Sequence, residues 1–129
     1  MFVSAVHHVA IIVSSESSLR FYELLGFKES FRKVRRFDTV VLMDGFEIQL
    51  EIFIDRRHPQ HPSGLDEPIG FRHFALRTLE PLETEIERLK GVFCNEGFDI
   101  KFGTIMKDWT GVKFCFVRDF DGLNIELRE

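Results

Sequence analysis

The chain has 129 residues, 44% of them hydrophobic and 29% charged, which is ordinary for one globular domain with a core of its own. Its formal net charge of −4 at pH 7 argues against nonspecific binding to nucleic acid or to an anionic membrane, because both need a basic surface. No apolar run approaches the roughly 20 residues of a membrane span, and residues 1–5 show no secretory signal. We therefore expect a cytoplasmic protein that binds neither nucleic acid nor membrane.

Two residue types give expectations about the core. The 15 phenylalanines predict a core filled largely by aromatic rings. Cys94 and Cys115 lie on apolar segments without the spacing of a metal-binding pair, which favours reduced core thiols over a disulfide or a zinc site.

The first half of the chain begins with residues 6–13, whose alternating polarity predicts a strand with His8 on its polar face. A helix follows, with N-capping hydroxyls at Ser14 and Ser15 and an end at Gly26. Residues 27–36 and 39–43 are expected to be strands, the first too charged to be central.

A hairpin turn is expected at Asp44 and Gly45, leading into a strand over residues 46–54. That strand alternates apolar residues with polar ones, and Glu51 lies on the polar face. The His- and Pro-rich stretch 58–64 is expected to be a loop, and such a loop holds ligand geometry poorly.

The second half repeats this order. Residues 71–77 predict a strand with His73 opposite its apolar face, and a helix starts near Pro81 with apolar residues at helical spacing. Strands are expected at residues 98–102 and 112–116. Asp121 and Gly122 then predict a tight hairpin turn into a last strand, in which Glu126 lies opposite the apolar side chains.

Each half thus reads βαβββ, which predicts an α+β fold built from two similar modules. We expect a single domain over residues 1–129, made of modules at about 5–55 and 70–129 and joined by a linker at 56–69.

Four residues stand out on this map, because the first strand of each half presents a His and the last strand presents a Glu: His8, Glu51, His73 and Glu126. If the first and last strands of a half pair in one sheet, each His shares a face with its Glu. Two imidazoles and two carboxylates suit a divalent ion such as Ni²⁺, Zn²⁺, Co²⁺, Mn²⁺ or Fe²⁺. Two unrelated histidines and two surface glutamates remain the alternative. His7 has the opposite strand parity and is the better candidate for a structural histidine.

Four segments, HHVAI at 7–11, FYELLGF at 21–27, GFRHFAL at 70–76 and RDFDGLNIE at 118–126, resemble the vicinal oxygen chelate superfamily. This is the group of glyoxalases, fosfomycin-resistance proteins and extradiol dioxygenases. The resemblance covers essentially the whole chain. It implies paired βαβββ modules forming a U-shaped barrel around one divalent metal ion, with His8, Glu51, His73 and Glu126 as its ligands.

The ligand set also sorts the members of this group. His-Glu-His-Glu resembles glyoxalase I, whereas methylmalonyl-CoA epimerases usually have Gln at the second position. Extradiol dioxygenases and fosfomycin transferases use three residues, and bleomycin-binding proteins lack the ligands. The closest resemblance is therefore to lactoylglutathione lyase.

Two positions depart from bacterial glyoxalase I, in which an Arg and an Asn contact glutathione. Ile12 and Asp55 stand at these positions, and an aspartate would repel the carboxylates of glutathione. Other candidate contacts for an anion are Lys33, Arg35, Arg36, Arg56 and Arg57, although charged residues on an edge strand are commonly just solvated.

These features predict a metal-dependent lyase or isomerase that stabilises an enediolate on a small carbonyl or thioester substrate. Glu126, with Glu51 as its counterpart, is expected to move the proton as general base and then acid. The alternatives are an epimerase of the methylmalonyl-CoA type, a thiol-transfer enzyme, or a non-catalytic protein that sequesters a ligand. Because paired modules expose sheet edges, we also expect a twofold homodimer.

Overall fold

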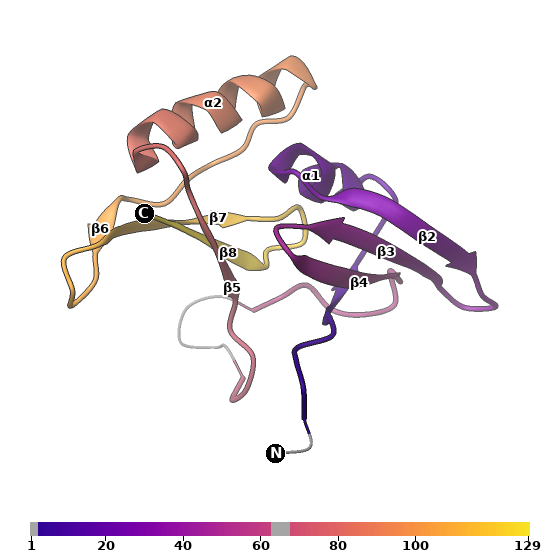
Figure 1. Ribbon diagram of the computed structural model, residues 1–129. Helices are drawn as coiled ribbons and strands as arrows, with labels where there is room; N and C mark the ends of the chain where they lie inside the picture. Colours follow the sequence, from indigo (N-terminus) through magenta and orange to yellow (C-terminus); the bar gives the residue numbers. More distant parts are fainter. Residues whose placement is uncertain (1–2, 63–67) are drawn as a thin grey trace. The chain divides into compact units, whose positions relative to one another are not determined.

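The structure is a computed structural model that describes residues 3–62 and 68–129 (Figure 1). Residues 63–67 of the expected linker at 56–69, residues 63–64 of the expected loop at 58–64 and residues 1–2 of the segment 1–5 lie outside the described residues. The chain divides into two units, Met1–Pro59 and Gln60–Glu129. Among the described residues, no helix is long and apolar enough to span a membrane.

Both units have the predicted βαβββ order. The elements of the first unit are β1 (Val9–Val13), α1 (Ser18–Leu25), β2 (Lys28–Val34), β3 (Thr39–Gly45) and β4 (Ile48–Ile54). Those of the second are β5 (Phe74–Arg77), α2 (Leu82–Asn95), β6 (Met106–Lys107), β7 (Lys113–Arg118) and β8 (Asn124–Arg128). The α+β class is confirmed.

The two sheets have the same topology. The strand orders are β1-β4-β3-β2 and β5-β8-β7-β6, so the first strand of each unit lies next to the last. These outer pairs, β1 with β4 and β5 with β8, are parallel, and the other neighbours are antiparallel. The highly charged β2 is an edge strand with every residue exposed, as its composition predicts.

In each unit the apolar side chains of one helix face and one sheet face are buried. Helix α2 buries its predicted stripe, Leu82, Ile86, Leu89 and Phe93. In β8, Ile125 and Leu127 are buried, whereas Asn124, Glu126 and Arg128 are not. Truncating Phe93 to Ala would cost about 3–5 kcal/mol of stability, because its fully buried ring leaves a cavity.

The core is less aromatic than expected. Among the described residues only Phe21, Phe27 and Phe93 are buried phenylalanines, and aliphatic side chains supply most of the core. The thiol prediction is half right: Cys115 is buried, whereas Cys94 is exposed, and both are free.

The hairpin between β3 and β4 turns two residues later than predicted. Gly45 pairs with Ile48, so Phe46 and Glu47 form the turn, with φ of 53° and 64°. Both residues accept the left-handed conformation that a type I′ turn requires, at a cost that the Phe46 ring offsets by packing 5.2 Å from the Phe27 ring. Gly45 is instead needed for close packing, since a Cβ there would lie 2.9 Å from Phe27.

Three further boundaries differ from the sequence prediction. Helix α1 starts at Ser18 without a side-chain cap, rather than at Ser14 and Ser15. The strand expected at 98–102 is wrong, because only Phe102 forms a bridge, with Val117, and the short strand β6 lies further on. The turn before β8 spans three residues, closed by an N–H of Asp119 that donates to the Leu123 carbonyl at 2.9 Å.

Candidate metal centre

Each unit brings its predicted His and Glu together. In the first unit, His8 Nε2 lies 3.8 Å from a carboxylate oxygen of Glu51. In the second unit, His73 Nε2 lies 3.8 Å from a carboxylate oxygen of Glu126. The two modules thus place an imidazole and a carboxylate at the same separation.

The parallel pairing of the outer strands explains this match. Ala10 lies opposite Glu51, and Ala75 lies opposite Glu126. In both units the His stands two residues before that Ala, so it projects from the same face of the sheet. The buried Ile11 and Val13 of β1 project from the other face. One repeated backbone arrangement therefore produces both pairs.

The donor atoms of each pair fit a divalent transition metal. A separation of 3.8 Å is too long for a hydrogen bond, but an ion at roughly 2.0–2.2 Å from each atom fits between them. Imidazole nitrogen and carboxylate oxygen are ligands that Zn²⁺, Ni²⁺ and Fe²⁺ share. Among the described residues no His, Cys, Asp or Glu extends these pairs into a group of three. Convergence of the two pairs on one ion stays a prediction.

The two pairs differ in their surroundings. The side chain of Glu126 is 12% exposed and that of Glu51 is 29% exposed. Arg128 lies 3.5 Å from the second oxygen of Glu126, and its guanidinium donates to Asp108 at 2.6 Å. The His73 ring lies edge-on to Phe116, with 5.0 Å between the ring centroids. The second pair is therefore held by neighbours on both sides.

The first pair is more open and has a second histidine beside it. His7 Nδ1 lies 2.9 Å from His8 Nδ1, which is hydrogen-bond distance. Both histidines precede β1 and are exposed. His7, expected to be a structural histidine on the helix side of the strand, is instead exposed beside His8.

Comparison with solved structures identifies the family. The chain is 32% identical to a glyoxalase family protein from Enterococcus faecalis, with 100% of each chain covered and a TM-score of 0.81. It is 33% identical to the protein SMU.1112c, with 98% of each chain covered and a TM-score of 0.79. The chain belongs to the glyoxalase family.

This membership confirms the resemblance to the vicinal oxygen chelate superfamily. A lactoylglutathione lyase from Agrobacterium tumefaciens shares the fold of this glyoxalase-family chain at 16% identity, with a TM-score of 0.64 and with 100% and 96% of the two chains covered. No protein-family model matches the sequence, and no curated protein matches it.

Asp55 is one of the two positions that depart from bacterial glyoxalase I, and its negative charge is paired in this glyoxalase-family chain. Its carboxylate accepts hydrogen bonds from the Arg57 side chain at 2.8 and 2.6 Å and from the Arg57 backbone N–H at 3.0 Å. His58 Nε2 lies 3.2 Å from it. These contacts, the Arg57 side chain first, hold the pKa of Asp55 well below its ordinary value. The partner cation offsets the repulsion expected toward an anionic substrate.

Two of the arginines proposed as anion contacts are already paired. Arg57 binds Asp55, and Arg35 donates to both oxygens of Asp38 at 2.6 Å. Both arginines line a cavity of about 410 Å³ in the first unit. Because their charges are neutralised by adjacent carboxylates, this cavity is a poor site for an added anion.

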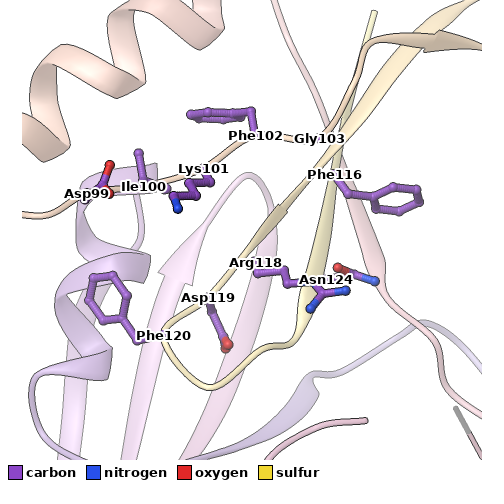
Figure 2. A pocket seen from close by; sticks show the side chains of 10 residues that line it. All are labelled: Asp99, Ile100, Lys101, Phe102, Gly103, Phe116, Arg118, Asp119, Phe120 and Asn124. Atoms are coloured by element: carbon purple, nitrogen blue, oxygen red, sulfur yellow. The ribbon is translucent and has the colours of Figure 1, made fainter. Parts of the chain in front are cut away.

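A second cavity, which the sequence did not indicate, lies in the second unit (Figure 2). It measures about 530 Å³, and the side chains that line it include Lys101, Arg118 and Asn124. Phe116, whose ring contacts the His73 ring, is also among the lining residues. The pattern missed it because segment 99–103 meets β7 only through tertiary structure.

The buried thiol near this pair is not available for chemistry. Burial, and secondarily the charge of Glu126, raises the pKa of Cys115 to about 11. The thiol is therefore protonated near neutral pH and is neither a nucleophile nor a metal ligand there.

Proposed function

We propose that the protein is a divalent-metal-dependent lyase or isomerase of the glyoxalase I type, acting on a small carbonyl or thioester substrate. The observation that carries this proposal is the pair of matched His–Glu separations, 3.8 Å in each module at the same strand register. A protein that only sequesters a ligand has no use for this repeated arrangement.

His8, Glu51, His73 and Glu126 would hold the metal ion. When bound, the ion would supply Lewis-acid stabilisation of negative charge on a substrate oxygen, which makes removal of a proton next to a carbonyl easier. The lyase from Agrobacterium tumefaciens, which shares the fold, supports this class of reaction.

Glu126 is the residue we assign to proton transfer. It is the less exposed of the two glutamates, and Arg128 and Asp108 orient it from one side while His73 flanks it on the other. A general base must be held within reach of the proton that it removes. Glu126 would take the proton from the substrate carbon and return it to the neighbouring carbon, and Glu51 would serve as its counterpart from the first module.

Metal analysis of the purified full chain tests this proposal. We expect one divalent metal ion per site by mass spectrometry after reconstitution, and turnover in a screen of hemithioacetals and acyl-CoA epimers. A wild-type protein that binds no metal at all would overturn the enzyme assignment and favour the ligand-sequestering alternative.

We further propose a twofold homodimer. Large apolar side chains such as Leu79 and Trp109 are almost fully exposed in the single chain, and association would cover some of this surface. Light scattering at micromolar concentration should give twice the chain mass of 15.1 kDa, and a species of single-chain mass would contradict the proposal.

A further inference from the structure

The cavity of the second unit is lined by two positively charged residues, Lys101 and Arg118. They flank the isolated antiparallel bridge between Phe102 and Val117. Val117 is fully buried, and by alternation along β7 Arg118 projects from the opposite face. Phe116, two residues before Arg118 on the same strand, projects from this face too, and it pairs with Glu126. The face therefore also carries Glu126.

Asn124 extends this row. It pairs with Arg118 across β7 and β8, and in Figure 2 its amide lies beside the Arg118 guanidinium. On its other side, the β5–β8 register places His73 next to Asn124, one residue before the pair of Phe74 and Ile125. The row therefore runs from Arg118, through an amide, to the histidine of the candidate metal pair, and Lys101 lines the same cavity.

Among the described residues, both cations lack a partner. Within residues 3–62 and 68–129, neither the Lys101 ammonium nor the Arg118 guanidinium forms an ion pair or a hydrogen bond. Of the carboxylates in the lining, that of Asp119 accepts the N–H groups of Asp121 and Leu123, both at 2.9 Å, and Asp99 is exposed.

The first module supplies an internal comparison. At the matching positions, Lys28 lies opposite Asp44, and Asp44 pairs with Gln49. Gln49 donates to the Asp44 carboxylate at 3.0 Å. In the first module, a carboxylate pairs with the lysine and the amide at this position. In the second module, an arginine takes the place of that carboxylate.

We propose that Lys101, Arg118 and Asn124 form an oxyanion-binding subsite, and that the substrate carries a carboxylate or phosphate group bound there. Two cations and an amide donor match the oxygens of such a group. Neighbouring strands are about 4.8 Å apart, so the anionic group lies roughly 5–10 Å from the His73–Glu126 pair. This assignment rests on the proposed function and restricts its substrates to small anionic carbonyl compounds.

Binding of probe anions to the metal-free full chain tests the subsite. The ¹⁵N-labelled protein is titrated with inorganic phosphate, acetate and the neutral acetamide at constant ionic strength. We expect saturating shifts of the Lys101, Arg118 and Asn124 amides with an anion but none with acetamide. Tighter phosphate binding would assign a phosphorylated substrate, and tighter acetate binding a carboxylated one.

Substitutions localise the effect. Arg118→Asp, which restores the composition of the first module, should abolish anion binding, and Lys101→Met should weaken it by about 10-fold or more. Lys28→Met, at the matching position of the first module, is the control and should change nothing. Arg118→Gln serves in place of Arg118→Asp should the latter not fold.

Shifts that do not saturate, that map elsewhere, or that persist in the Arg118 variant would overturn the subsite. The metal stoichiometry of the same variant keeps the two proposals apart. Arg118→Asp should bind metal as the wild type does, so loss of anion binding with metal retained concerns the subsite alone, whereas a wild type that binds no metal defeats the proposed function.

Discussion

The two His–Glu pairs share a backbone geometry and a separation of 3.8 Å, yet they differ in their surroundings. Glu126 lies between His73 and Arg128, and Asp108 fixes Arg128 in turn. Glu51 is more exposed, and the His8 ring lies beside the exposed His7. The repeated fold places the candidate ligands alike in both modules, whereas the contacts that orient Glu126 come from residues of the second module.

The largest effect should come from removing the two carboxylates in turn. Glu126→Gln keeps the shape and one coordinating oxygen but takes up no proton near neutral pH, so turnover should fall by about 10²–10⁴-fold at full metal occupancy. Glu51→Gln should be milder. Turnover is measured with saturating Ni²⁺, Zn²⁺, Co²⁺ and Mn²⁺ on a substrate that the wild type accepts. Recovery of Glu126→Gln to wild-type turnover with any of these ions would reduce Glu126 to a ligand.

Removing an imidazole should mainly affect metal binding. His73→Ala leaves an incomplete ligand set in the more enclosed module, and we expect loss of most bound metal, since even outer contacts of metal ligands are worth about 10–100-fold in affinity. His58→Ala is the control, because His58 is not among the four predicted ligands and lies beside Asp55 instead. Mass spectrometry after dialysis gives the stoichiometry, and an unchanged value in His73→Ala would contradict the site.

The row that differs between the modules offers a gain-of-function experiment. Asp44→Arg gives the first module the composition of the second, with Lys28 opposite an arginine next to Gln49. We expect a second phosphate site with an affinity within about 10-fold of the first, detected by new saturating shifts at residues 28, 44 and 49. Asp44→Asn, which removes the anion without adding a cation, should create no such site.

The smallest effect concerns acid stability. Hydrogen bonds from Arg57 lower the pKa of Asp55, so the carboxylate stabilises the fold above its unfolded pKa near 4, and this stability is lost as pH falls toward the folded pKa. Asp55→Asn should be less stable than wild type at pH 7 and should lose less on acidification. Urea midpoints at pH 7, 5 and 3 measure this, and parallel curves for the two proteins would contradict it.

Local sequence patterns predicted the features that depend on hydrophobic periodicity. Alternation in residues 123–127 predicted that Glu126 lies on the face of β8 opposite the buried side chains, and helical spacing predicted the buried stripe of α2. The proximity of each His to its Glu was predicted on the condition that the first and last strands pair, and the structure shows that pairing.

Features set by tertiary contacts were not predictable in this way. The Phe46 turn depends on the Phe27 ring, which no local pattern reveals. The placement of Lys101 and Arg118 around one cavity depends on a bridge between residues far apart in sequence. The sequence alone predicts a repelling charge at Asp55. Its pairing with Arg57 is not predictable in this way, because it is set by the conformation of the loop after β4.

The pairing of first and last strands has a consequence for folding kinetics. Val9 meets Leu50, and Phe74 meets Ile125, so each sheet closes over a loop of roughly 40 or 50 residues. The difference in closure entropy between these loops is only about 0.2 kcal/mol, so neither module is favoured to close first on this ground. Each imidazole meets its carboxylate only when that slow, nonlocal step is complete. An ion that binds a His and its Glu together therefore selects the closed module over the open chain, and folding rates measured with and without metal would report on this coupling.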